Sequence, residues 1–528
     1  MVSSTFTLSD DYWHSIEIQN EDLEFLYSYL LEIETPLSSH ELMRELIKDR
    51  IKREREFAEK QRSKEAKVYL PRDEYKVGEE LAFPALDWKT GKVTGVRDAR
   101  SYYDYSFKVI EVEFENDVKR QFAAGLAEHK LNQPVAVDED DPLLNPDQVI
   151  EEYGEKLAST LEKALKQQED FVYIAGCWFP RALLVDVNMG NLNLTEAVLD
   201  MAGGGPLPTA DLLPEVDLPE GVNPKLAEFS LDLAMQEDER FDEVGSTGKV
   251  AWFLKRLEPE EVIKTPIYLL YKQQDYDRSL LDEQMIALEQ HLDDEHSPLE
   301  DEDGDVMSKE VSLIYPHWRV GSVPLTPKLA RLFPTAYESP RVRFMLVDGQ
   351  SGDKFPGWVA RLERYVYGLR QWYLDRGVMP GSKVILRRGK KPGEVIVDTA
   401  PHRAAKEWLR TALIGADGGV VYATLKQTVE TAFDDWMMVF MPSDTTALDQ
   451  AWQERQKNPP PFEQVVADTL RELAKLNPQS HVHVAELYSA VNLVFRCPPG
   501  PIMALLSSRP WFTHVGDLHF RFDNSEVE

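Results

Sequence analysis

Hydrophobic residues recur along this chain with two periods, which predict both helices and strands. Residues 22–33 predict an amphipathic helix, because their apolar side chains fall on one helical face. Residues 107–114 alternate apolar and polar positions, which is the pattern of a half-buried strand. Residues 342–347, 384–388 and 394–397 predict further strands. The expected fold class is therefore α+β, in several domains.

A loosely repeated segment indicates the folding unit. Residues 238–254 and 509–522 each place an aromatic residue four positions before a Gly, a Val directly before that Gly, and a strand-like run after it. Helical sequence precedes both copies. An internal repeat identifies the unit that the fold multiplies. We expect this unit to be a winged helix, in which helices lead into a β-hairpin.

The segment expected to form the second helix of each unit also recurs. Residues 39–43, 209–213 and 484–488 share an acidic third residue, then a Leu and an apolar or aromatic residue. This set resembles the HARE-HTH family of winged helices, which occurs in the RNA polymerase delta subunit and in restriction and chromatin proteins. The delta subunit likewise couples such a domain to an acidic segment. The resemblance implies nucleic-acid binding or scaffolding.

Two further regions predict small β-barrels. The pattern Val77-Gly-Glu and Gly91-Lys-Val resembles small barrels of the Tudor, KOW and CarD kind, which bind proteins, RNA or DNA. The order of elements between residues 310 and 400 resembles the DNA-binding pseudobarrel of plant transcription factors and some restriction endonucleases. The residues that carry this second resemblance are Pro324-Leu-Thr-Pro-Lys, Trp358-Val, Gly368-Leu-Arg and Met379-Pro-Gly-Ser-Lys-Val-Ile-Leu.

These features divide the 528 residues into repeated winged-helix units and two small barrels, joined by acidic linkers. Within residues 401–461 we expect a helical extension with one hairpin, made of residues 403–414, a turn at Asp417-Gly-Gly and residues 420–423, followed by a helix over 424–432. In the first half of the chain the expected parts are a winged-helix-like unit (1–72), a small barrel (73–132), an acidic linker with a helix (133–169) and a winged-helix unit (170–275). The second half is expected to contain an acidic disordered linker (276–309), a basic pseudobarrel-like domain (310–400), a helical extension and linker (401–461) and a C-terminal winged-helix unit (462–528).

Charge is distributed unevenly. The formal net charge is −33, which by itself disfavours a phosphate backbone as partner. Residues 341–410, however, hold 15 Lys and Arg against 7 Asp and Glu, and residues 44–67 hold 10 against 6. One interpretation is ordinary local fluctuation on a well-solvated surface. The other is a pair of nucleic-acid contact regions on an acidic body. The charged helix within 44–67 fits either a solvated face or a recognition helix.

The expected DNA contacts lie in the basic domain. A hairpin across Gly389-Lys-Lys-Pro-Gly projects from the sheet, and projection lets basic side chains reach a duplex. Tyr365 is the aromatic residue expected to be most exposed for stacking on bases. The candidate nucleic-acid-binding residues are Arg361, Arg364, Arg370, Lys383, Arg387, Arg388, Lys390 and Lys391.

No catalytic motif stands out. Phosphate-binding loops, nucleophile elbows and the H-E-x-x-H zinc motif are absent from the sequence. His481 and His483 form a close pair without zinc-finger spacing, and the acidic pairs Asp242-Glu243 and Asp434-Asp435 have no suitably spaced Lys or third carboxylate. We therefore expect a non-enzymatic protein with no cofactor, no metal and no small-molecule ligand.

Location and partners follow from composition. Two cysteines, Cys177 and Cys497, are too few for a disulfide framework and suit a reducing compartment. No apolar run approaches the roughly 20 residues that span a bilayer. We expect a cytoplasmic DNA-binding or transcription-associated regulator whose partners are duplex DNA and a protein such as RNA polymerase. The alternative is a protein-interaction scaffold, an acidic polymerase-associated factor or a nucleic-acid mimic.

Overall fold

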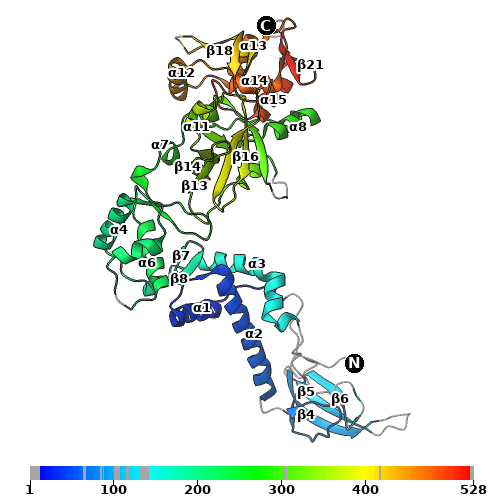
Figure 1. Ribbon diagram of the computed structural model, residues 1–528. Helices are drawn as coiled ribbons and strands as arrows, with labels where there is room; N and C mark the ends of the chain where they lie inside the picture. The colour runs from blue at the N-terminus through cyan, green and yellow to red at the C-terminus, as the bar shows by residue number, and fades with distance from the viewer. Residues whose placement is uncertain are drawn as a thin grey trace. The chain divides into compact units, whose positions relative to one another are not determined.

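The computed structural model is an α+β structure with a seven-stranded, nearly closed, barrel-like sheet (Figure 1). The chain divides into two compact units, residues 1–185 with 221–229 and residues 186–220 with 230–528. The described residues are 12–63, 67–83, 86, 89–99, 107–114, 118–127, 129, 132, 142–219, 221–300, 304, 306–415 and 418–523. Within them, no helix has the length and apolar character needed to cross a membrane.

The N-terminal unit contains three long helices and a small sheet. The first helix begins where Gln19 and Asp22 form a reciprocal capping box, and the third begins with Pro146 after the Asn145 cap. Buried Leu26, Leu30 and Leu161 place their apolar faces in the core. The elements are α1 (Asn20–Ile33), β1 (Leu37–Ser38), α2 (Ser39–Ser63), α3 (Pro146–Leu165), β7 (Phe171–Ile174) and β8 (Cys177–Pro180), with sheet order β1-β8-β7.

A five-stranded sheet is inserted between α2 and α3. Its alternating strands bury Phe83, Ile110 and Val112, as the period-two pattern of residues 107–114 predicts. The Tyr69 hydroxyl donates to the Ala123 carbonyl, which ties the start of the sheet to its last strand. The strands are β2 (Lys67–Val68), β3 (Glu80–Phe83), β4 (Lys89–Asp98), β5 (Lys108–Phe114) and β6 (Val118–Ala124), in that order.

Residues 186–254 show the order of elements seen in the N-terminal unit without its inserted sheet. The Leu207–Trp252 bridge stands in for the first short strand. Asp232 accepts hydrogen bonds from the Thr209 hydroxyl and the Trp252 indole, so the helices and the hairpin share one buried polar contact. The elements are α4 (Met189–Met201), α5 (Thr209–Leu212), α6 (Pro224–Gln236), β9 (Phe241–Glu243) and β10 (Trp252–Leu254).

Residues 462–522 repeat the order once more. A helix, a short strand, two helices and a hairpin follow one another, and the last strand again lies in the middle of the sheet, in the order β20-β22-β21. A similar order of elements therefore occurs at three places in the described chain. The elements here are α13 (Phe462–Ala474), β20 (Val482–His483), α14 (Val484–Val491), α15 (Pro499–Ser508), β21 (Phe512–Gly516) and β22 (His519–Phe522).

The barrel-like sheet occupies residues 308–399, with strand order β11-β16-β17-β13-β14-β15-β12. Every second residue of β13 is buried, so alternation in the sequence sets which side chains fill the interior. Its strands are β11 (Ser308–Ser312), β12 (Ser322–Pro324), β13 (Arg341–Asp348), β14 (Lys354–Ala360), β15 (Tyr365–Tyr367), β16 (Lys383–Arg388) and β17 (Glu394–Thr399). Its helices are α9 (Tyr315–Val320), α10 (Pro327–Ala330) and α11 (Arg370–Asp375).

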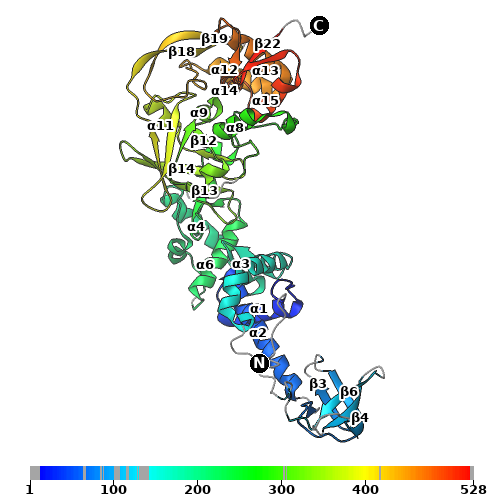
Figure 2. The same cartoon turned by 90° about the vertical axis from the view of Figure 1, so that its right-hand side faces the viewer.

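Two expectations about the connecting segments are wrong. The helix expected over 424–432 is wrong, because strand β19 (Val420–Val429) continues through most of it and pairs along its full length with β18 (Ala405–Ile414). Cross-strand pairing overrides the helical propensity of this Leu-, Lys- and Ala-containing segment. Figure 2 shows the pair as a long curved ribbon. Two further helices belong to this unit: α7 (Glu260–Ile263) precedes the barrel-like sheet in the sequence, and α12 (Thr446–Lys457) follows β19.

The second wrong expectation concerns the acidic linker at 276–309, which we expected to be disordered. Its described part contains α8 (Glu283–Leu292), which Asp282 caps through the Met285 amide. Directly after α8, Asp293, Asp294 and Glu295 are buried. Their burial is possible because cationic side chains from distant parts of the sequence meet them, which no local pattern could indicate.

Candidate nucleic-acid interface

The hairpin tip between β16 and β17 carries the most exposed of the expected contact residues. The Gly389 amide donates to the Glu394 carbonyl, and Gly393 adopts a φ of 79°, which favours glycine. Between the two glycines, Lys390 and Lys391 are exposed. The turn chemistry of the sequence therefore places two lysines on a projecting loop, as expected.

A cavity of about 480 Å³ lies beside this tip. The chain following α10 forms its other wall, and the Arg388 guanidinium donates to the Arg331 carbonyl at 3.1 Å to join the two walls. Leu332, Phe333 and Pro334 supply apolar surface. Four basic side chains line the cavity, namely Arg331, Arg388, Lys390 and Lys391. Positive groups gathered around a concave surface suit a phosphate or another compact anion.

Two of the other expected contacts form ion pairs with residues on neighbouring strands. The Arg387 guanidinium forms an ion pair with Asp398 at 2.9 Å, and the Lys383 ammonium forms one with Glu310 at 3.0 Å. Each partner lies on the strand next to its own, because cross-strand neighbours on one face approach closely. Neither Lys383 nor Arg387 lines the cavity.

The three remaining arginines donate to backbone carbonyls. Arg361 donates to Ser339 at 2.7 Å and Arg364 to Glu295 at 3.1 Å. Arg370 donates to the Trp318 carbonyl at 3.0 Å and lies over the Trp318 ring. The structure thus brings Arg388, Lys390 and Lys391 together, and it separates the other five expected residues from that cavity.

Arg331 is the member of the cavity that sequence reasoning missed. It follows α10 and lies outside the basic stretch of residues 341–410, so counting charges in that stretch did not include it. The contact between Arg331 and Arg388 spans 57 positions. No sequence signal except a basic residue after a capped short helix pointed to it.

The expectation that Tyr365 is exposed is wrong. Its side chain is 1% exposed, and its hydroxyl donates to the Glu261 carbonyl. Both faces of β15 are covered here, because Tyr365 packs with Leu269, Val320 and Ala360 while the next residue, Val366, packs in the main core. Most aromatic residues of the basic domain are likewise core residues rather than stacking surfaces: Phe344, Trp358, Trp372 and Tyr373 are all buried.

The second basic stretch, residues 44–67, is partly neutralised by its own surroundings. Arg50 and Arg53 both contact Asp22 of α1, and Arg53 also pairs with Asp49 one turn earlier. Lys48 pairs with Glu45 at 2.7 Å. These contacts favour the solvated-face interpretation for the described part of α2. Side chains from residue 57 to residue 66 lie outside the described residues.

The histidine pair and the acidic pairs have structural partners. His483 accepts from the Ala485 amide as an N-cap, Asp242 pairs with Arg341, and Asp434 accepts from the Trp436 and Met437 amides. Burial raises the pKa of Glu243 to about 7, against two backbone hydrogen bonds that lower it. Among the residues that the structure describes, no group of His, Cys, Asp and Glu is placed to hold a metal ion.

One buried constellation resembles a catalytic triad in connectivity. The His317 ring lies 2.9 Å from the Ser322 hydroxyl and 3.2 Å from a Glu295 carboxylate oxygen. Ser322 has no exposed surface, and Glu295 is also paired with Arg496 at 2.7 Å. A substrate cannot reach the hydroxyl in this conformation, so the three residues form part of the core.

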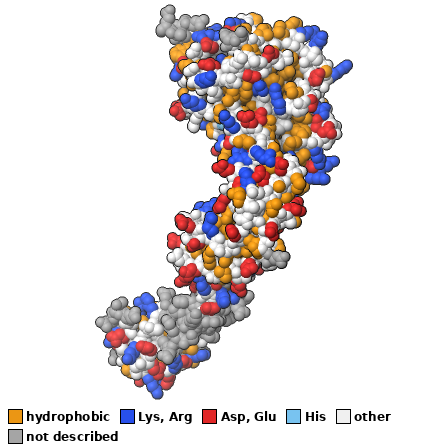
Figure 3. Space-filling model, turned by 90° about the vertical axis from the view of Figure 1, so that its left-hand side faces the viewer, with side chains coloured by type: hydrophobic (Ala, Val, Ile, Leu, Met, Phe, Trp, Pro, Cys, Tyr) orange, Lys and Arg blue, Asp and Glu red, His pale blue; other side chains and the backbone are white. Residues whose placement is uncertain are grey.

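Basic and acidic side chains are interspersed over the face drawn in Figure 3. Comparison with protein-family models, with curated proteins and with solved structures found no match for this chain.

Proposed function

We propose that this protein binds duplex DNA through the basic cavity at the β16–β17 hairpin, as a non-enzymatic, transcription-associated regulator. The observation that carries the proposal is the gathering of Arg331, Arg388, Lys390 and Lys391 around one concave surface. Lysine and arginine contacts to phosphate supply most of the affinity of sequence-independent DNA binding. The projecting tip gives these side chains the reach that such contacts need.

We also propose that the three recurring segments are winged helices that act as connectors rather than as DNA readers. Their shared order of elements and the central position of the last strand support this assignment. The third helix, which would enter a major groove, is unsuited to DNA in each case. α15 is buried from Pro499 to Leu506, α3 carries mostly acidic charge on exposed positions, and α6 has Lys225 as its one exposed charged residue.

The proposal is tested by fluorescence anisotropy of a random duplex with the full chain over a salt series. Each phosphate contact contributes about −0.9 to the slope of log K against log salt concentration. The K390E/K391E variant should bind far more weakly and show a shallower slope. The K272E/K406E variant changes charge equally at exposed lysines outside the cavity, and it should bind like the wild type. Equal loss in both variants, or no binding at low salt, would refute the proposal.

A scaffold function is the second candidate, because the β18–β19 ribbon exposes apolar side chains. Trp408 is 68% exposed, and the cross-strand pair Leu413 and Val421 is 45% and 50% exposed. Exposed apolar clusters of this kind mark protein-binding surfaces. A W408S/V421S variant that keeps DNA binding but loses a co-purifying protein would support the scaffold function. Retention of every co-purifying protein would argue against it.

A further inference from the structure

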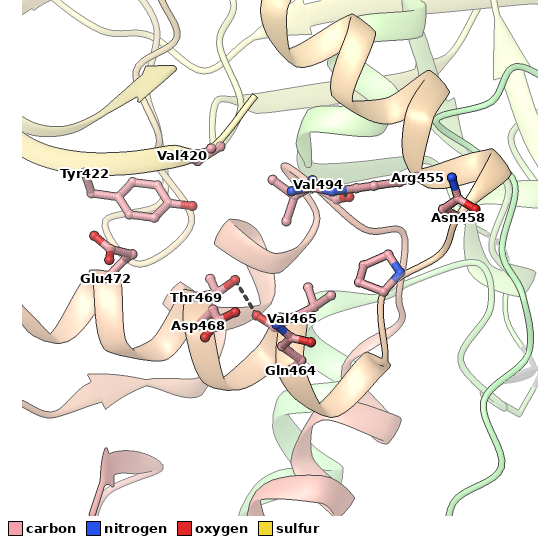
Figure 4. A pocket seen from close by; sticks show the side chains of 12 residues that line it. Val420, Tyr422, Arg455, Asn458, Gln464, Val465, Asp468, Thr469, Glu472 and Val494 are labelled. Atoms are coloured by element: carbon pink, nitrogen blue, oxygen red, sulfur yellow. Dashed lines mark hydrogen bonds between the residues drawn. The ribbon is translucent and has the colours of Figure 1, made fainter. Parts of the chain in front are cut away.

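A second cavity, of about 400 Å³, lies among β19, α12 and α13 (Figure 4). Its size falls in the range of small-ligand sites, roughly 300–1,000 Å³. Aliphatic side chains form part of its wall, and charged groups project from two different helices. The residues used below are Tyr422, Arg455, Val465, Glu472 and Val494.

Arg455 is a half-buried cation that lacks an acidic partner. Its guanidinium donates once, to the Val494 carbonyl at 3.1 Å. Burial lowers its pKa while Tyr422 acts in the opposite sense, and among the described residues no carboxylate is paired with it. A guanidinium has five N–H donors, so most of its hydrogen-bonding capacity is unused by the protein. An anionic group in the cavity would supply the missing acceptor.

Glu472 presents the complementary charge. One of its carboxylate oxygens pairs with Lys475 at 2.5 Å, while Oε2 is buried and has no hydrogen-bond partner among the described residues. Tyr422 lies close enough to respond to both groups. Burial raises the pKa of its hydroxyl, Glu472 raises it further and Arg455 lowers it. The cavity thus offers an unfilled donor set and an unfilled acceptor on different helices.

The geometry points to a binding site for a small zwitterion with an aliphatic side chain, either a free amino acid or a short peptide. Arg455 takes the carboxylate, Glu472 takes the ammonium group, and Val465 and Val494 contact the side chain. Leaving the buried Glu472 Oε2 unpaired is costly, and such a ligand supplies its partner while also binding the half-buried Arg455 guanidinium. The site is independent of the DNA-binding cavity and departs from the expectation that the protein has no small-molecule ligand.

The first test is isothermal titration of the full chain with L-leucine and with leucyl-leucine. Binding of leucine identifies a free amino acid as the ligand class, and binding of the dipeptide alone identifies a peptide. N-acetyl-leucine lacks the ammonium group and leucinamide lacks the carboxylate, so each should bind at least about tenfold more weakly than leucine. Failure of both zwitterions to bind, or equal binding of the blocked analogues, would overturn the proposal without requiring any variant.

Variants then assign the two charges. R455M should weaken leucine at least about tenfold while leaving leucinamide unchanged, and E472Q should do the reverse with N-acetyl-leucine. R455K keeps the charge and covers the case in which R455M fails to fold. R509Q, on an exposed ion pair with Glu463, is the matched control and should bind as the wild type does. Unchanged affinity in R455K, R455M and E472Q would place the ligand elsewhere and refute the assignment.

Discussion

The acidic segment after α8 and the basic hairpin tip are opposites in more than charge. Asp294 and Glu295 are 2% and 3% exposed, whereas Lys390 and Lys391 are exposed. Composition alone suggests that both are solvated. The difference comes from partners: the fully buried Arg496 lies 2.8 Å from Asp294 and 2.7 Å from Glu295.

The comparison shows that the partners of a charged segment decide whether it is buried or exposed. The Tyr488 hydroxyl donates to Asp294, and His317 lies beside Glu295, so residues almost 200 positions apart fix the acidic segment. Burial alone would raise the pKa of Glu295, but Arg496 and His317 hold it well below its ordinary value. At the hairpin tip Glu394 lies near Lys391, but among the described residues neither Lys390 nor Lys391 is held in a buried set of opposite charges.

The largest expected effect is that of removing Arg496. R496M leaves two buried carboxylates without their cation, so unfolding of this half of the chain should become easier by about 3–5 kcal/mol. Urea unfolding followed by near-ultraviolet circular dichroism measures the change. R509M breaks the exposed pair with Glu463 and should cost about 0–1 kcal/mol. Similar values for the two variants would show that the acidic segment is not held by its buried cation.

A buried carboxylate without a matching cation should behave in the opposite way with pH. The pKa of Glu243 is raised to about 7, so its contribution to stability is present below the unfolded pKa of about 4.3 and is lost as pH rises through 7. E243Q should therefore be more stable than the wild type at pH 8, by about 3 kcal/mol, with the difference shrinking toward pH 5. A pH-independent difference in urea unfolding, as expected for the exposed control E283Q, would contradict this.

Sequence patterns predicted the parts of the fold that local chemistry decides. Alternation in residues 342–347 gave β13, and Gly389 with Gly393 gave the hairpin turn. The continuation of β19 through residues 424–429 was missed, because this segment favours a helix and becomes a strand only by pairing with β18. Local preference loses to tertiary contacts in such segments.

The candidate site was predictable to a similar extent. The tip lysines follow from the turn, whereas the Arg331 carbonyl accepts a hydrogen bond from Arg388 across 57 positions and the Arg331 guanidinium donates to the Gly304 carbonyl. The adjacent arginines Arg387 and Arg388 also differ in place, because Arg387 is paired with Asp398 and Arg388 lines the cavity. Such contacts are decided by neighbours in space, which the local sequence does not show.

Arg331 gives a direct test of that point. R331Q should lower the affinity for random duplex DNA and make the slope of log K against log salt shallower by about 0.9, because one phosphate contact is lost. Fluorescence anisotropy over a salt series measures both quantities. R319Q is the comparison, since Arg319 is paired with Asp449 and does not line the cavity. An unchanged slope in R331Q would remove this residue from the interface.

The smallest expected effect is that of Arg387, the expected contact whose charge is already used. Its pair with Asp398 is partly exposed, so R387Q should change stability by only about 0–1 kcal/mol. Because its guanidinium contacts Asp398 rather than lining the cavity, R387Q should also leave the salt slope of DNA binding nearly unchanged. D398N, which frees Arg387 without removing it, should strengthen DNA binding slightly. If R387Q instead weakened DNA binding as much as R331Q, the ion pair with Asp398 would not prevent Arg387 from contacting DNA. Ion pairing would then not explain why some basic residues bind DNA and others do not.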